Sequence, residues 1–147
     1  GLLIHKLGSA AEQKEKTMQM LTRVGLQASD AEKYPHQFSG GQRQRIGIAR
    51  ALVLQPKVVV CDEPVSALDV SVQAQILLLL KELQFEMSLS YIFISHDLRV
   101  VRHIADNIVV MNKGKIVEHG KVNEVYSSPQ QEYTQHLLSA IPGRKAA

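Results

Sequence analysis

The most chemically suggestive stretch is residues 38–43, with the sequence FSGGQR, which leads into a helical pattern over residues 42–54. Ser39 is a favourable N-cap, because its hydroxyl accepts hydrogen bonds from backbone N–H groups of the first turn. The two glycines allow close approach to a backbone whose unpaired N–H groups and helix dipole attract anions. The stretch therefore indicates an anion site, and an ordinary Gly-Gly turn capped into a helix is the alternative interpretation.

Polar side chains also follow two short apolar runs. Asp62 and Glu63 come directly after residues 58–61, and His96 follows the run at residues 91–95. Runs this short and wholly apolar are typical of strands that are covered on both faces of a parallel sheet. Ligands of α/β sheets bind outside the carboxyl ends of the strands. Taken alone, however, an Asp-Glu pair that caps a strand and a structural histidine explain these residues as well.

Four motifs occur here in one order: SGGQ at residues 39–42, Asp-Glu after an apolar strand, SALD at residues 66–69, and the strand-end histidine. This order resembles the second half of an ABC-type ATPase domain, in which the motifs are the signature loop, Walker B, the D-loop and the H-loop. The resemblance covers nearly all of the chain. It implies an α/β P-loop NTPase (RecA-like) fold, with a mostly parallel sheet and flanking helices.

The resemblance also implies a role for each motif, with ATP and Mg²⁺ as cofactors. Asp62 would hold the Mg²⁺ on the nucleotide phosphates, and Glu63 would be the general base that polarises the attacking water. His96 would reach the γ-phosphate or that water. The residues expected to contact the nucleotide are Ser39, Gly40, Gly41, Gln42 and Asp69. In the family the signature loop faces the γ-phosphate held by a partner subunit, and the D-loop crosses the interface between the two.

One expected motif is missing from the 147 residues, which contain no G-x-x-x-x-G-K-[ST] phosphate loop. We therefore expect an N-terminally truncated domain. Its parts would be residues 1–55 from the helical subdomain, ending in the signature loop and helix; residues 56–120 from the core with Walker B, D-loop and H-loop; and residues 121–147 as a C-terminal helical segment. By family the chain is an ATPase, but without a phosphate cradle it should not hydrolyse ATP alone.

Several stretches are similar to the ATPase subunits of bacterial oligopeptide and dipeptide importers, with glutathione and nickel importers close behind. They are residues 34–42, residues 61–71, and a Pro-x-x-x-Tyr-Thr segment at Pro129, Tyr133 and Thr134. The resemblance implies ATP-driven peptide uptake, with a peripheral position at the cytoplasmic face of the bacterial inner membrane. Implied partners are a second ABC ATPase subunit, in a homo- or heterodimer, and integral membrane permease subunits. A substrate-binding protein would be an indirect partner, and no nucleic acid is expected.

Two other classes of function compete with this interpretation. One is a non-catalytic interaction module that supplies the signature loop in trans, which accounts for the missing phosphate loop. The other is a soluble ABC-type ATPase that acts on DNA or ribosomes rather than in transport. It would need long coiled-coil insertions or two fused ATPase domains, and neither is visible in this sequence.

Composition narrows the possible classes further. A formal charge of +3 without a long basic run gives no indication of nucleic-acid binding. The longest apolar run, at residues 76–80, is too short to span a bilayer, and the chain does not open with an export signal. Cys61 is the single cysteine, which excludes an internal disulfide, and the histidines lack the spacing of a metal site. A cytosolic protein fits these features.

Periodicity and capping residues predict the individual elements. The expected helices are one opened by a capping box at Ser9 and ended by Gly25, one at residues 70–87, one at residues 98–105, and two near residues 122–127 and 131–140. Residues 107–111 and 115–119 should form a hairpin around Gly114. Residues 27–37 should be a loop with a short helical turn, and the tail at residues 142–147 should fray. We also expect the sheet to expose an unpaired edge and apolar surface.

Overall fold

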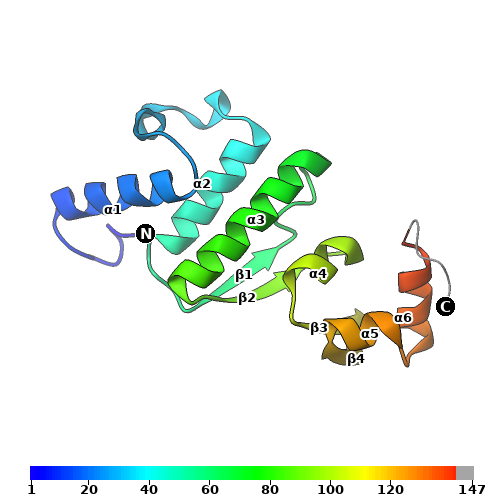
Figure 1. Cartoon of the computed structure of the whole chain (residues 1–147). Coiled ribbons are helices and arrows are strands. Elements are labelled where there is room, and N and C mark those ends of the chain that lie inside the picture. Colours follow the sequence, from blue (N-terminus) through cyan, green and yellow to red (C-terminus); the bar gives the residue numbers. More distant parts are fainter. Residues whose placement is uncertain (142–147) are drawn as a thin grey trace. The chain divides into compact units, whose positions relative to one another are not determined.

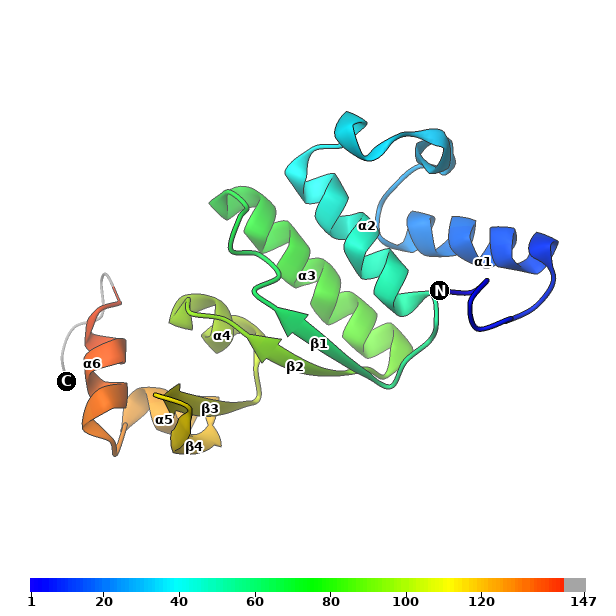
Figure 2. The same cartoon turned by 180° about the vertical axis from the view of Figure 1, so that it is seen from behind.

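A computed structural model describes residues 1–141 and confirms the α/β class (Figures 1 and 2). The chain divides into two compact units, Gly1–Ile94 and Ser95–Ala147, which are described separately below. Each unit combines helices with a two-stranded sheet, parallel in the first unit and antiparallel in the second. The division into segments at residues 55 and 120 stays a prediction.

The first unit contains four helical segments before its first strand and one helix between its two strands. In chain order its elements are α1 (Ala10–Arg23), the 3₁₀ helices η1 (Ala28–Glu32) and η2 (Pro35–Gln37), α2 (Gly40–Leu52), β1 (Val58–Asp62), α3 (Val70–Met87) and β2 (Ser90–Ile94). The capping box at Ser9 is confirmed: its hydroxyl accepts from the N–H of Glu12, whose carboxylate accepts from the N–H of Ser9. Gly25, with φ of +78°, follows the C-cap of α1.

The parallel sheet of the first unit is covered on one face only. Strands β1 and β2 pair in a register that sets Val60 opposite Ile92. On the covered face Cys61 is buried, and the Tyr91 hydroxyl donates to the carbonyl of Leu80 in α3 at 3.0 Å. Figures 1 and 2 show α2 and α3 side by side next to this sheet.

The opposite face corrects one prediction from the sequence. Its four apolar side chains are about half exposed: Val58 55%, Val60 61%, Ile92 55% and Ile94 48%. The expectation that these strands are covered on both faces is therefore wrong for the described chain, because no helix of the first unit packs on this side. The expectation of exposed apolar surface is confirmed.

The second unit is a small hairpin with three short helices. Its elements are α4 (Leu98–Ile104), β3 (Asn107–Asn112), β4 (Lys115–Lys121), α5 (Val122–Ser127) and α6 (Glu132–Ser139). The predicted hairpin is confirmed, and its turn places Lys113 and Gly114 in the left-handed region, with φ of 47° and 76°. The apolar cluster comprises Val101, Ile108, Val110, Val122, Val125, Tyr126 and Leu138. The tail at residues 142–147 lies outside the described residues.

Buried Glu118 fixes the start of α6 in this unit. Its carboxylate accepts hydrogen bonds from the backbone N–H groups of Gln130 at 2.8 Å and Gln131 at 3.2 Å. Burial opposes ionisation, but the nearby Thr134 hydroxyl and these two N–H donors outweigh it and hold the pKa of Glu118 below its usual value. The Thr134 hydroxyl itself does not meet hydrogen-bond geometry, so the backbone donors form the actual attachment.

We predict that the exposed sheet face drives self-association of the chain. Replacing Val60 and Ile92 together by threonine should lower light scattering and apparent mass at a given concentration, because less apolar surface is exposed. Threonine keeps the β-branched shape that strands favour, so secondary structure by circular dichroism should persist. Ile76→Ala is the contrasting control: this side chain is fully buried, and its loss should cost about 2–5 kcal/mol of stability. Scattering that is unchanged by the threonine pair would contradict the prediction.

Candidate functional site

The signature stretch forms the exposed start of α2. The Ser39 hydroxyl accepts from the N–H of Gln42 at 3.3 Å, and the Gln42 side-chain oxygen accepts from the N–H of Ser39 at 3.0 Å. The helix begins at Gly40, two residues before the predicted start. The N–H groups of Gly40 and Gly41 belong to the first turn and therefore have no carbonyl partner within the helix. A helix start with unpaired N–H groups has the geometry that binds anions, and the hydrogen bond from the Ser39 N–H to Gln42 stabilises this helix start.

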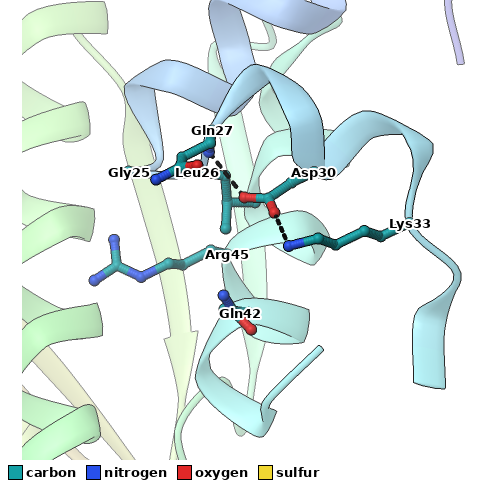
Figure 3. A pocket seen from close by; sticks show the side chains of 7 residues that line it. All are labelled: Gly25, Leu26, Gln27, Asp30, Lys33, Gln42 and Arg45. Atoms are coloured by element: carbon teal, nitrogen blue, oxygen red, sulfur yellow. Dashed lines mark hydrogen bonds and ion pairs between the residues drawn. The ribbon is translucent and has the colours of Figure 1, made fainter. Parts of the chain in front are cut away.

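A pocket of about 470 Å³ adjoins the first turns of α2 at Gln42 and Arg45 (Figure 3). It is lined by Gly25, Leu26, Gln27, Asp30, Lys33, Gln42 and Arg45. The Arg45 guanidinium donates to the carbonyl of Val24 at 2.7 Å, across 21 positions of sequence. The carboxylate of Asp30 accepts from Lys33 at 2.6 Å and from the N–H of Gln27 at 2.8 Å, and these bonds lower its pKa. Arg45 therefore attaches α2 to the end of α1, and Asp30 joins the two capping residues of η1.

The D-loop segment is held by side chains of the helix that follows it. Asp69 is the N-cap of α3, and its carboxylate accepts from the Ser71 hydroxyl at 2.7 Å and from the N–H of Val72 at 3.0 Å. The side-chain amide of Gln73 donates to the carbonyls of Val65 and Leu68, both at 3.0 Å. The segment between β1 and α3 is thus attached to the start of α3 at Val65, Leu68 and Asp69.

The structure brings the signature loop and the D-loop together. A Cβ atom built on Gly40 would lie 3.5 Å from Cδ2 of Leu68, an ordinary contact. One built on Gly41 would lie only 2.7 Å from Cγ1 of Val72. The N-terminal ends of α2 and α3 therefore touch within one chain, with their capping residues Ser39 and Asp69 on neighbouring helices (Figure 1).

The two acidic residues stand at the carboxyl end of β1, as the sequence predicts. Asp62 is the last residue of the strand, and Glu63 follows it; both are exposed. Glu63 has φ of +45°, a left-handed conformation that is uncommon for any residue but glycine. Its N–H donates to the carbonyl of Ile94 at 3.0 Å, and its carbonyl accepts from the Ser66 hydroxyl at 3.1 Å. These bonds hold a sharp turn directly after the strand.

A cavity of about 240 Å³ adjoins these carboxylates, and its lining includes Asp62, Glu63, Cys61 and Tyr91. Burial raises the pKa of Tyr91 to about 12, and the nearby Cys61 adds to the effect. Burial also raises the pKa of the Cys61 thiol. Both groups therefore stay neutral at physiological pH, and they provide this cavity with a packed wall rather than with reactive anions.

The last predicted site residue belongs to the second unit. His96 is exposed and lies between Ser95, which opens the unit, and Asp97, the N-cap of α4. The Ser95 hydroxyl accepts from the N–H of Asp97 at 3.0 Å, and Asp97 pairs with Arg99 at 2.8 Å. The first unit therefore holds Ser39, Gly40, Gly41, Gln42, Asp62, Glu63 and Asp69, and the second holds His96.

Within residues 1–141 no group of three or more His, Cys, Asp or Glu side chains could hold a metal ion. Asp62 fits Mg²⁺ in another way, because this ion is commonly held by one or two carboxylates together with substrate phosphates and water. Across the same residues, no helix has the length and apolar character needed to cross a membrane.

Reasoning from the sequence missed three residues that support the site. Val72 and Gln73 lie within the helix predicted at residues 70–87, and Arg45 lies within the helical pattern at residues 42–54, with no further role predicted for them. A glutamine next to an apolar helix position offered a weak signal, since an amide there needs partners. Nothing in the sequence indicated that Arg45 would reach Val24 or that Val72 would meet Gly41.

Comparison with known proteins gives consistent findings. Residues 3–66 match the family described as ABC transporter. The chain is 57% identical over 141 residues to the dipeptide transport ATP-binding protein DppF of Haemophilus influenzae, a match that covers 96% of this chain and 43% of that protein. It is 56% identical over 138 residues to the oligopeptide transport ATP-binding protein AppF of Bacillus subtilis, covering 94% and 42%. The chain thus spans less than half the length of these curated relatives.

A solved structure extends the likeness to the fold. The ADP conformation of MJ1267, an ATP-binding cassette of an ABC transporter, matches with a TM-score of 0.76 and 25% sequence identity, and the match covers 92% of this chain and 53% of that one. These findings confirm the resemblance to dipeptide and oligopeptide transport ATP-binding proteins and the fold class inferred from the motifs.

We predict that the Asp69 cap makes the stability of α3 depend on pH. Hydrogen bonds from the Ser71 hydroxyl and the Val72 N–H lower its pKa, so its stabilising effect is complete above the ordinary carboxyl pKa and is lost as pH falls through the lowered value. Asp69→Ala should lower the thermal unfolding midpoint near neutral pH, whereas Asp69→Asn should retain most of the cap. The difference between wild type and Asp69→Asn should shrink at acidic pH, as the pH falls through the lowered pKa of Asp69. Equal midpoints for the alanine and asparagine variants at both pH values would contradict this role.

Proposed function

We propose, on the premise that residues 3–66 belong to the ABC transporter family, that the chain is part of the ATP-binding and ATP-hydrolysing subunit of an importer for peptides. The observation that carries the proposal is the exposed, capped start of α2 beside the D-loop, in a chain 57% identical to a dipeptide transport ATP-binding protein. Transport is favoured over a role on DNA or ribosomes because both relatives described above are named for peptide transport.

The signature loop would act in trans. The N–H groups of Gly40 and Gly41, with the Ser39 hydroxyl, would face the γ-phosphate of an ATP held by the phosphate loop of a partner subunit. Gln42 would keep this helix start in shape through its bond to the Ser39 N–H. Asp69, next to the loop in the same chain, would lie at the interface between the two subunits. ATP would thus be sandwiched between subunits.

Hydrolysis would use the residues at the carboxyl ends of the strands. Glu63 would orient and polarise the attacking water as a general base, and its carboxylate is exposed for this task. His96 would contact the γ-phosphate or the water. Asp62 would hold Mg²⁺, which neutralises charge on the phosphates when it is bound.

Binding of ATP would close a pair of ATPase subunits and drive integral membrane permease subunits between their two access states, and hydrolysis would reopen the pair. A substrate-binding protein would deliver the peptide to the permease. The ATPase subunit would lie peripherally at the cytoplasmic face of the bacterial inner membrane. The names of the relatives, dipeptide and oligopeptide transport ATP-binding proteins, support the role in peptide transport. The other roles are what the resemblance to ABC importers implies.

A second candidate function concerns the 147 residues by themselves. Because they contain no phosphate loop, their independent activity would be that of a module that lends its signature loop to a partner subunit. This candidate and the importer subunit share the same contact between the start of α2 and a γ-phosphate, and they differ in whether Glu63 and His96 are used.

We predict that residues 1–147 alone show no Mg²⁺-dependent ATP turnover, and that they raise the turnover of a partner subunit that carries a phosphate loop. Ser39→Ala should reduce the stimulated rate roughly 10- to 100-fold, since a hydrogen bond to a charged group contributes about 1.5–3 kcal/mol. Release of inorganic phosphate over a titration of the chain measures the effect. Glu63→Gln separates the two candidate functions, because it lowers the rate only if the chain's own base is used.

Ser9→Ala is a matched control for Ser39→Ala. It removes the same kind of capping serine, paired with Glu12, from α1. Both substitutions remove a helix cap, but only Ser39 is proposed to face the γ-phosphate. Only Ser39→Ala should therefore lower the stimulated rate. The proposal is contradicted if both variants stimulate equally, or if wild-type residues 1–147 turn over ATP without a partner and lose this activity in Glu63→Gln.

A further inference from the structure

Gly41 has no conformational reason to be glycine. Among the described residues, the glycines with positive φ are Gly8, Gly25 and Gly114, so Gly41 has a backbone that alanine adopts readily. A glycine inside a helix is less stable than alanine, because more backbone freedom is lost on folding. The reason for glycine at this position therefore lies in what approaches it, which can be a ligand, a neighbouring helix or both.

The space is taken by α3 of the same chain. A Cβ atom on Gly41 would come within 2.7 Å of Cγ1 of Val72, a separation that real Cβ atoms essentially never show. Val72 cannot yield cheaply, since a β-branched side chain in a helix has one strongly preferred rotamer. Gly47, in the same helix, gives the contrast, because a Cβ there would meet nothing within 4 Å.

Val72 is also the residue through which the D-loop is held. Its N–H donates to the carboxylate of Asp69 at 3.0 Å, and its neighbour Gln73 donates to the carbonyls of Val65 and Leu68. The same residue therefore meets α2 with its side chain and donates its backbone N–H to Asp69, the N-cap of α3.

We propose that Val72 is a positioning residue, which with Gly41 joins the signature loop and the D-loop of one chain into a single steric unit. Neither loop can shift along the other without opening or compressing this contact, so both loops move together when a nucleotide site closes. The steric part of the proposal stands on the contact alone, whereas its consequence for ATP turnover rests on the proposed function.

A double-mutant cycle in chemical unfolding tests the steric part. Gly47→Ala should lower the unfolding equilibrium constant roughly two- to fivefold, because alanine is the better helix former. Gly41→Ala should raise it roughly five- to 100-fold through overpacking against Val72. In a Val72→Ala background, Gly41→Ala should become neutral or stabilising, as at Gly47. The same effect of Gly41→Ala in both backgrounds would overturn the proposal. If Gly41→Ala alone does not fold, recovery of folding in the double variant supports it.

Turnover of a partner subunit that carries a phosphate loop tests the consequence. Val72→Ala should lower the maximal stimulation by the chain roughly two- to 30-fold while the ATP concentration at half-maximal rate stays the same, because Val72 acts by positioning. Val72→Thr, which keeps the branched shape, should retain most of the stimulation. Unchanged stimulation by Val72→Ala overturns the positioning role. If the wild-type chain does not stimulate at all, the proposed function fails, and the unfolding cycle still decides the steric claim.

Discussion

The first unit is organised around the close approach of α2 and α3 at Gly41. At this point the backbone of one helix meets a rigid branched side chain of the other, and a single added methyl group would not fit. Each helix begins within a few residues of the contact, with Ser39 and Asp69 as N-caps. The signature loop and the D-loop, which are expected to have different functions at a nucleotide site, are therefore positioned by the same packing contact.

Hydrogen bonds connect the two helices at this contact to the elements around them. Gln42 closes the capping box of α2, and Gln73 holds the carbonyls of the D-loop. Arg45 joins α2 to the end of α1 by its bond to Val24. The sharp turn at Glu63 is fixed to β2 through the carbonyl of Ile94. In contrast, the outer face of the sheet carries half-exposed valines and isoleucines, so the sheet of the first unit is packed against helices on one face and exposed on the other.

Local signals made much of this structure predictable. The helix over Val70–Met87 matches the predicted bounds, and the capping box at Ser9 starts α1 as expected, since caps and periodicity act over a few residues. The coverage of β1 on both faces was wrongly predicted, because an apolar run does not reveal whether anything packs on each side. The tight fit at Gly41 was also beyond prediction, since glycine there could equally reflect a turn, a ligand or a neighbouring helix.

The most direct test of the account is amide hydrogen exchange of the chain as Glu63→Gln, mixed with a partner subunit that carries a phosphate loop. The account predicts slower exchange at residues 39–42 and 66–69 together, and only when both partner and ATP are present, because a γ-phosphate covers the exposed start of α2. Exchange that is unchanged at residues 39–42, or slowed equally without ATP, would contradict the central claim that this helix start receives a nucleotide from another subunit.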